Sequence, residues 1–269
     1  IKNNNMSDTR AIGIFDSGLG GLTVVKRVRE ILPNENIIYF GDTARLPYGS
    51  KSRKKIIEFS IENTNFLLSH NVKIIVVACN TSTAVALYEI RKMTNIPVIG
   101  VIAPGARAAV AFTKNNKIGV IGTAGTINSE EYTKHILELN DKIKVYSQAC
   151  GLFVPIVEEG WIDKEITNHI IAEYLMPLKI AGIDTIILGC THYPLLKNGI
   201  ANFFENKINI VDSAESCAAA VKEKLAELNI LNSSAARGTA TFFVSDTPAK
   251  FSEIGSRFLD EEFSAIKVV

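Results

Sequence analysis

The 269-residue sequence has no long apolar segment, no excess of charge of one sign and few cysteines. Its longest apolar runs, such as residues 74–79, fall far short of the roughly 20 residues that cross a bilayer. The 29 Lys and Arg residues against 28 Asp and Glu leave a net charge of +1. Because such a chain has no bulk positive field to attract phosphates, we expect neither a nucleic acid nor a membrane as its partner.

The start of the chain also lacks the apolar segment that directs secretion. The first ten residues are polar and rich in Asn, and residues 1–5 precede Met6. We treat residues 1–5 as a tail outside the fold. Since no export signal is present, we predict a cytoplasmic protein whose cysteines stay reduced.

Cofactor-binding motifs are missing or incomplete. The four cysteines, at positions 79, 150, 190 and 217, form no CxxC pair, so neither a zinc site nor a thioredoxin-type motif is indicated. A dinucleotide motif starting at Gly18 fails because position 23 is Thr, and no Gly-Lys-Ser/Thr sequence completes a phosphate-binding loop. We therefore expect no metal and no cofactor.

The remaining composition, with 47% hydrophobic and 21% charged residues, is typical of a folded globular protein. Short apolar runs alternate with longer amphipathic stretches. The pattern predicts strands at residues 11–15, 36–40, 74–78, 98–101, 117–121, 144–147, 185–188, 208–211, 240–244 and 265–268. It predicts helices at residues 22–32, 52–68, 83–93, 104–112, 129–139, 164–178, 195–204, 214–228 and 249–258. Alternating strands and helices indicate an α/β fold with mainly parallel sheets.

A weak internal repeat suggests two similar lobes. Ile12-Gly-Ile-Phe-Asp-Ser-Gly aligns with Ile118-Gly-Val-Ile-Gly-Thr-Ala, and Ile75-Val-Val-Ala-Cys-Asn-Thr aligns with Ile186-Ile-Leu-Gly-Cys-Thr-His. We predict two mainly parallel sheets flanked by helices and related by pseudo-symmetry, with the active site in the cleft between them. The predicted first domain combines residues 6–103 with 213–269, and the second comprises residues 104–212.

Ligands of open α/β sheets bind beyond the carboxyl ends of the strands. Five of these strand ends are followed by small polar segments, at residues 16–23, 41–50, 79–83, 122–126 and 190–194. Two of the segments begin with cysteines at equivalent positions of the repeat, Cys79 and Cys190. Cys150 and Cys217 lack such a context, and we interpret them as buried structural thiols.

Two thiols on opposite sides of one ligand suit proton removal from one face of a carbon and proton delivery to the other. A thiol at a helix N-terminus has a lowered pKa, which we expect here, and it then serves as both base and acid. His192, two residues after Cys190, is placed to orient or charge that sulfur. Asp16 is by default a turn former or helix cap, and Glu158 one of two solvated acidic residues.

Four segments carry a resemblance to a known family. They are Gly13-Ile-Phe-Asp-Ser-Gly-Leu-Gly-Gly-Leu-Thr23, Leu46-Pro-Tyr-Gly49, Ala78-Cys-Asn-Thr-Ser-Thr83 and Gly189-Cys-Thr-His-Tyr-Pro-Leu195. From about residue 11 onward, the chain closely resembles the bacterial glutamate racemases, a family of the cofactor-independent aspartate/glutamate racemase superfamily. The resemblance implies interconversion of L- and D-glutamate, supply of D-glutamate for peptidoglycan, and a homodimer.

The resemblance also implies roles for individual residues. Cys79 corresponds to the base that deprotonates D-glutamate, and Cys190 to the base for L-glutamate. Asp16 corresponds to the group that assists the first thiol, and His192 and Glu158 to those that assist the second. The implied substrate-binding positions are Asp16, Ser17, Tyr48, Gly49, Asn80, Thr81, Thr123, Thr126, Thr191 and His192.

Other functions remain open at this point. A racemase of the same superfamily acting on aspartate or another small acidic amino acid has the same two thiols. A two-lobed regulatory protein that binds a dicarboxylate without chemistry has the same cleft. A redox role for the Cys79 and Cys190 thiols is the weakest of these alternatives.

Overall fold

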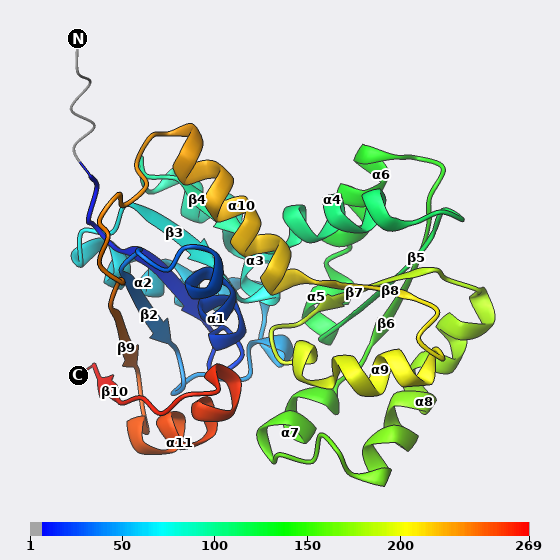
Figure 1. Cartoon of the computed structure of the whole chain (residues 1–269). Helices are drawn as coiled ribbons and strands as arrows, with labels where there is room; N and C mark the ends of the chain where they lie inside the picture. The colour runs from blue at the N-terminus through cyan, green and yellow to red at the C-terminus, as the bar shows by residue number, and fades with distance from the viewer. Residues whose placement is uncertain (1–6, 269) are drawn as a thin grey trace.

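The computed structural model describes residues 7–268 (Figure 1). The expected tail of residues 1–5 and Met6, where the predicted first domain begins, lie outside the described residues. The described strands form two sheets in which every pair is parallel. The predicted α/β class with mainly parallel sheets is therefore confirmed.

The first sheet has the strand order β10-β9-β2-β1-β3-β4. Its strands are β1 (Ile12–Asp16), β2 (Ile37–Gly41), β3 (Ile74–Val77), β4 (Val98–Gly100), β9 (Ala240–Val244) and β10 (Ala265–Lys267). The second sheet has the order β6-β5-β7-β8. Its strands are β5 (Lys117–Gly122), β6 (Lys144–Ala149), β7 (Thr185–Gly189) and β8 (Asn209–Asp212). Each expected strand is present, with ends that differ by at most two residues.

The central strands are apolar on both faces because helices cover both sides of each sheet. In β1 and β3 every residue is buried, and the side chains do not alternate between polar and apolar. This continuous pattern is typical of parallel strands inside an α/β protein. Because the apolar run is continuous, the sequence pattern alone predicts these strands.

Helices surround both sheets. Those next to the first sheet are α1 (Leu22–Ile31), the 3-10 helix η1 (Tyr48–Ser50), α2 (Arg53–Ser69), α3 (Asn80–Lys92) and α11 (Pro248–Leu259). Those next to the second are α4 (Ile102–Phe112), α5 (Ala124–Asn128), α6 (Glu131–Leu139), α7 (Phe153–Glu158), α8 (Glu165–Ala181), η2 (Tyr193–Leu196) and α9 (Lys197–Phe203). We call each sheet with these helices the first and the second lobe. Helix α10 (Ser213–Glu227) follows β8 and packs against both α1 and α4, so it crosses between the lobes (Figure 1).

Several helices differ from the prediction. The helix expected at residues 83–93 begins earlier, at Asn80, because the Cys79 side chain caps it. The helix expected at residues 129–139 begins later, at Glu131 of α6, since Glu130 adopts left-handed backbone angles, and the short α5 before it was not predicted. Helix α7 was not predicted, because six residues containing Pro155 carry too little periodicity.

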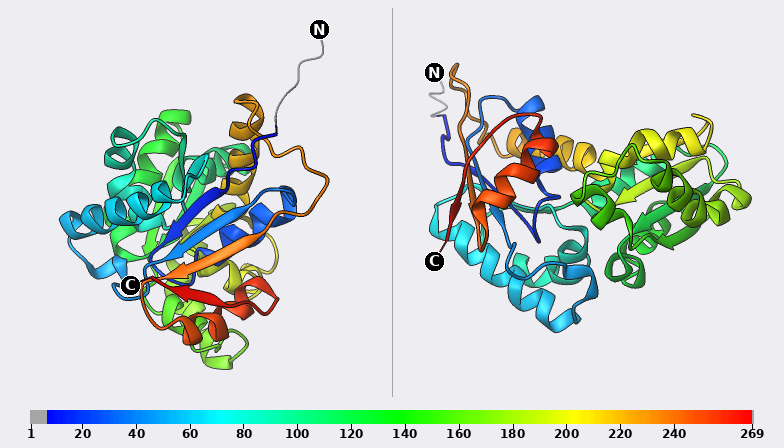
Figure 2. Two further views of the ribbon diagram at one scale, coloured as in Figure 1. Left: turned by 90° about the vertical axis from the view of Figure 1, so that its left-hand side faces the viewer. Right: turned by 90° about the horizontal axis from the view of Figure 1, so that it is seen from below.

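The two lobes repeat one topology. The order β2-β1-β3-β4 in the first sheet corresponds to β6-β5-β7-β8 in the second. In each lobe, the first strand along the chain lies between the second and the third. Among the described strands, the first sheet alone is extended, by β9, which pairs with β2, and by β10, which pairs with β9; both come from the end of the chain (Figure 2). Cys79 and Cys190 therefore follow corresponding strands, β3 and β7.

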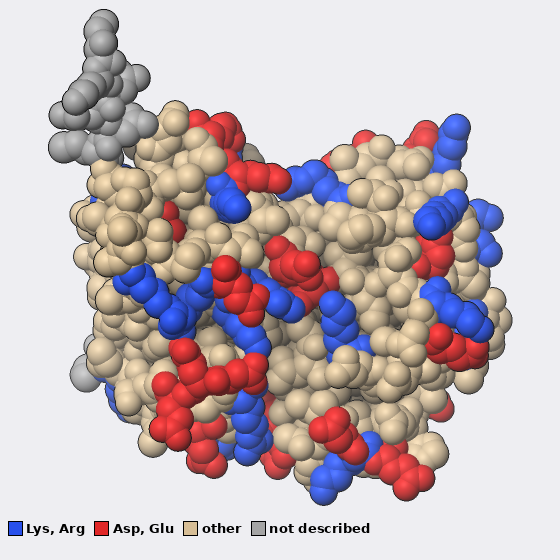
Figure 3. Space-filling view, in the orientation of Figure 1, with Lys and Arg blue, Asp and Glu red and all other residues tan. Residues whose placement is uncertain are grey.

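The surface carries both signs of charge. On the face shown in Figure 3, Lys and Arg side chains are interspersed with Asp and Glu over both lobes, which agrees with the net charge of +1. Within residues 7–268, no helix has the length and apolar character required to cross a lipid bilayer.

Candidate active site

A cavity of about 500 Å³ lies between the lobes, at the carboxyl ends of β1, β3, β5 and β7. It is lined by Ser17, Gly18, Leu46, Pro47, Tyr48, Gly49, Ser50, Cys79, Asn80, Thr81, Thr123, Ala124, Thr126, Gly151, Val154, Pro155, Glu158, Gly189, Cys190, Thr191 and His192. Every residue singled out from the sequence for this site is among them except Asp16, which is fully buried behind the cavity wall.

Cys79 contributes a sulfur from the first lobe. It follows β3 and caps α3, so its Sγ accepts a hydrogen bond from the Ser82 backbone N–H at 3.4 Å. The thiol also donates to Ser17 Oγ at 3.8 Å. Burial, reinforced by the negative charge of Asp16, nevertheless raises the pKa of Cys79 to about 11. The expectation of a lowered pKa is wrong for this thiol, because desolvation outweighs the helix N-terminus.

Cys190 contributes a sulfur from the second lobe, and its surroundings carry the opposite charge. Its Sγ lies 3.9 Å from Nδ1 of His192, whose Nε2 lies 3.0 Å from Oε1 of Glu158. Burial alone lowers the pKa of His192, but the hydrogen bonds with Cys190 and Glu158 outweigh it and raise the pKa to about 10. A protonated imidazole therefore lies between a thiol and a carboxylate, and it stabilises a negative charge on the sulfur.

Asp16 of the first lobe forms a hydrogen bond with a residue of the second lobe. Its Oδ1 accepts from the Thr191 hydroxyl at 3.5 Å, across the lobe boundary, and its Oδ2 accepts from Gly18 N–H at 3.0 Å. Burial raises the pKa of Asp16, although the charge of His192 opposes the shift. The carboxylate thus shapes the turn after β1, whereas the N-cap of α1 is Gly21.

Three threonine hydroxyls meet where the lobes touch. Thr81 Oγ1 at the start of α3 lies 3.0 Å from Thr123 Oγ1 and 3.3 Å from Thr126 Oγ1, and the last two lie 3.2 Å apart. Each hydroxyl has one proton and two lone pairs. The cluster can therefore turn donors toward an anion in the cavity without any fixed positive charge.

Asn80 provides a further donor. Its Oδ1 accepts from the Tyr132 hydroxyl at 2.7 Å, whereas its Nδ2 is buried and has no hydrogen-bond partner among the described residues. A buried donor without a partner costs about 1–3 kcal/mol. Because Asn80 lines the cavity, a ligand oxygen there can restore the missing bond.

The loop containing Tyr48 and Gly49 closes one side of the cavity. The Tyr48 ring is buried, and its hydroxyl donates to Asp42 and accepts from Asn63 Nδ2 at 3.1 Å, so burial and the Asp42 charge raise the pKa of Tyr48 far above its usual range. At Gly49 a Cβ atom would lie only 2.9 Å from Cβ of Thr123. A glycine is required there for the loop to contact the second lobe.

The sequence reasoning missed the apolar wall of the cavity. Val154 and Pro155 of α7, with Leu46 and Pro47 opposite, line it without having been proposed as site residues. Val154 and Pro155 could have been predicted from their position, because residues 150–155 directly follow β6, and this strand ends at the same sheet edge as β5 and β7. No Lys or Arg is among the residues described as lining the cavity. An anionic ligand would therefore be held by hydroxyls, an amide and the N-terminus of α3.

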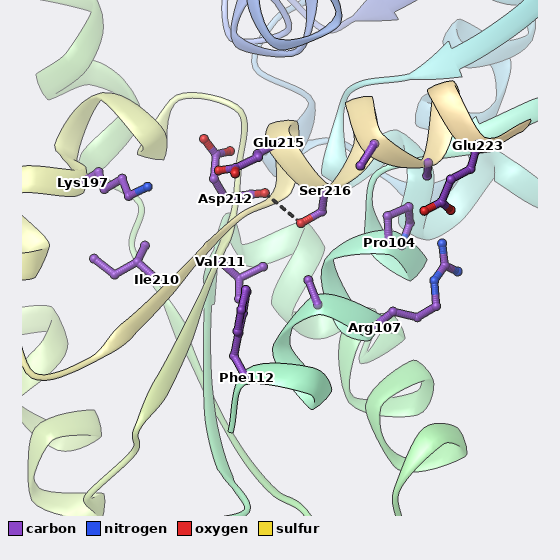
Figure 4. A pocket seen from close by; sticks show the side chains of 13 residues that line it. Pro104, Arg107, Phe112, Lys197, Ile210, Val211, Asp212, Glu215, Ser216 and Glu223 are labelled. Atoms are coloured by element: carbon purple, nitrogen blue, oxygen red, sulfur yellow. Dashed lines mark hydrogen bonds between the residues drawn. The ribbon is translucent and has the colours of Figure 1, made fainter. Parts of the chain in front are cut away.

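A second cavity of about 470 Å³ lies among α4, α10, β8 and the start of α9 (Figure 4). Arg107 and Glu223 point toward one another across it, and Lys197 lies near Asp212 and Glu215. None of the residues described as lining it is a cysteine or a histidine. This cavity contains none of the residues predicted for the active site.

Comparisons with known proteins agree on one group. Residues 13–221 match the Asp/Glu/Hydantoin racemase family. The chain is 49% identical to glutamate racemase of Geobacter metallireducens over 250 residues, 93% of each chain. It is 50% identical to glutamate racemase of Neisseria meningitidis serogroup B over 266 residues, 98% of each.

Solved structures give the same result. Glutamate racemase of Francisella tularensis in complex with D-glutamate superposes with a TM-score of 0.91 at 41% identity, covering 97% of this chain and 98% of that one. A glutamate racemase isoform of Bacillus anthracis reaches a TM-score of 0.94 at 40% identity, with the same coverage. An aspartate racemase homologue from Pyrococcus horikoshii has a TM-score of 0.59 at 20% identity, which shows a shared fold alone.

Proposed function

The chain belongs to the Asp/Glu/Hydantoin racemase family, and from this premise we propose that it interconverts L-glutamate and D-glutamate through two cysteine bases without a cofactor. The observation that carries the mechanism is that Cys79 and Cys190, from opposite lobes, line one cavity. Relatives at 49–50% identity over 93–98% of the chain are glutamate racemases, which supports glutamate over aspartate as the substrate.

The proposed reaction moves one proton in and one proton out. The Cys190 thiolate removes the α-proton of L-glutamate and becomes a thiol, leaving a carbanion at Cα. The Cys79 thiol then protonates the opposite face, yielding D-glutamate and a Cys79 thiolate. The reverse reaction starts from that state, so atoms and charge balance in both directions.

The neighbouring groups have different tasks in this proposal. The imidazolium of His192, held by Glu158, stabilises the Cys190 thiolate and keeps it beside the substrate. Asp16 lies close enough to Cys79 for its charge to act on the thiol, and it assists proton movement at that sulfur. The two thiols therefore lie beside groups of opposite charge.

Substrate binding uses neutral donors. The two carboxylates of glutamate face Ser17, the threonine cluster (Thr81, Thr123 and Thr126), the Asn80 amide, and Thr191, with the loop at Tyr48 and Gly49 closing over them. The α-proton is weakly acidic, so its removal requires donors already oriented toward the developing negative charge in a site with little water. The apolar wall of Val154 and Pro155 supports such an environment.

Several broader features belong to the same proposal. The product D-glutamate would supply peptidoglycan synthesis, and the protein would act in the cytoplasm as a homodimer. Four free cysteines are consistent with a reducing compartment. We also propose the division into residues 6–103 with 213–269 and residues 104–212, which the addition of β9 and β10 to the first sheet supports.

A direct test follows the circular dichroism of L-glutamate incubated with the pure protein and no added cofactor. We expect the signal to decay to zero and, in D₂O, deuterium to enter at Cα. Cys79→Ala and Cys190→Ala should each reduce racemisation in both directions by at least about 1,000-fold. Racemisation retained by either variant would rule out the two-base mechanism, and faster turnover of aspartate would reassign the substrate. Tight glutamate binding by calorimetry without deuterium exchange would instead indicate a binding protein.

A further inference from the structure

Tyr132 lies where both cysteine segments come together. It belongs to α6 of the second lobe and is 3% exposed, and its hydroxyl donates to Asn80 Oδ1 in the first lobe at 2.7 Å. Its ring also packs against Gly189, because a Cβ atom there would lie 3.1 Å from Cε2 of Tyr132. One side chain thus contacts the residue that follows Cys79 and the residue that precedes Cys190.

The hydrogen bond determines which end of the Asn80 amide is available. With Oδ1 engaged by Tyr132, the nitrogen Nδ2 remains without a partner among the described residues. Rotating the amide would exchange the acceptor and the donor, and the Tyr132 hydroxyl would lose the oxygen to which it donates. Tyr132 therefore keeps Nδ2, the donor group, free on a residue that lines the cavity.

We propose that Tyr132 is a positioning residue for substrate binding: from the second lobe, it orients the Asn80 amide so that Nδ2 donates to a carboxylate oxygen of the substrate. The inference rests on the proposed glutamate racemisation. Because the Tyr132–Asn80 bond crosses between lobes, it forms only when they are in contact. Lobe contact therefore prepares Asn80 for the substrate.

Kinetics of Tyr132→Phe provide the main test, because this change removes the hydroxyl and keeps the buried ring. We expect KM for glutamate to rise about tenfold while kcat stays within about threefold. In an Asn80→Ala background, adding Tyr132→Phe should change KM by less than about twofold, since the residue acts only through Asn80. If the two effects multiply, Tyr132 does not act through the amide, and the inference is wrong.

A second variant tests the orientation of the amide. Asn80→Asp keeps an acceptor for Tyr132 but removes the donor and adds a negative charge. We expect its KM to rise at least as much as that of Tyr132→Phe, and an unchanged KM would contradict the proposed donor role.

The matched control is Thr167→Val, which removes another buried hydroxyl of the second lobe, one that donates to the Trp161 carbonyl at 2.6 Å. It should leave KM and kcat within about twofold of the parent. A rise in KM in Thr167→Val equal to that in Tyr132→Phe would assign the effect to general destabilisation. If the unmodified chain does not racemise glutamate, the proposed function fails first; if it does and Tyr132→Phe behaves like the parent, only this inference fails.

Discussion

The two cysteines occupy the same place in the repeated topology, yet their electrical surroundings are opposite. Cys79 lies near the buried carboxylate of Asp16, and its pKa is raised to about 11. Cys190 lies beside His192, which Glu158 and the sulfur itself keep protonated, with a pKa of about 10. One thiol is held neutral next to an anion, and the other is paired with a cation.

The sequence repeat shows where this difference originates. Asp16 ends β1, and its counterpart at the end of β5 is Gly122. His192 comes two residues after Cys190, and its counterpart two residues after Cys79 is Thr81. Each lobe has therefore retained the strand and the thiol but differs in the charged residue that sets its protonation. The comparison teaches that a repeated topology can place two equivalent thiols in different electrostatic environments.

Among the effects that test this comparison, the largest is a difference in reactivity between the two thiols. With a pKa of about 11, the Cys79 thiolate fraction at pH 8 is about one in a thousand. The two side chains are similarly accessible, at 5% and 7% exposure. We expect iodoacetamide to modify Cys190 about 100-fold faster than Cys79, as followed by peptide mass spectrometry. Equal alkylation rates would contradict the difference in electrostatic environment between the two thiols. Buried Cys217 serves as the unreactive reference.

The next effect concerns the cation beside Cys190. His192→Asn should lower racemisation about 100-fold, and Glu158→Gln about tenfold, because the thiolate loses its stabilising charge. Both changes should slow alkylation of Cys190 and leave Cys79 unaffected. In the parent protein, activity should fall as the pH rises through about 10, where His192 loses its proton. A profile that stays level to pH 11 would contradict the assigned state of His192.

The smallest expected effect is an increase, in the rate at which Cys79 is alkylated. Asp16→Asn removes the negative charge that helps to raise the pKa of Cys79, so that pKa should fall and alkylation of Cys79 should accelerate, by about tenfold. Racemisation should decrease about tenfold, since Asp16 no longer assists proton movement. The informative result is that alkylation of Cys79 and racemisation change in opposite directions. Slower alkylation of Cys79 in Asp16→Asn would mean that the carboxylate activates the thiol in the unliganded protein.

Much of the site was predictable from local sequence. The residues after β1, β3, β5 and β7 are small and polar, and parallel pairing brings the ends of β1 and β3 to one edge of the first sheet and those of β5 and β7 to one edge of the second, so each half of the site follows from these positions. The apolar wall on α7 was missed because Val154 and Pro155 carry no chemical signal of their own, and only their position after β6 points to the site. The early start of α3 was missed because cysteine is an unusual cap.

The sequence by itself determined the α/β class, the ten strands and the presence of two equivalent cysteines, because apolar runs and polar strand ends are local properties of the chain. The tertiary structure alone decided that both cysteines line one cavity and that the pKa of Cys79 is raised. Burial and charges from residues distant in the chain set a pKa, and no local pattern reports them. The contact of Tyr132 with Asn80, between residues 52 positions apart, is of the same kind.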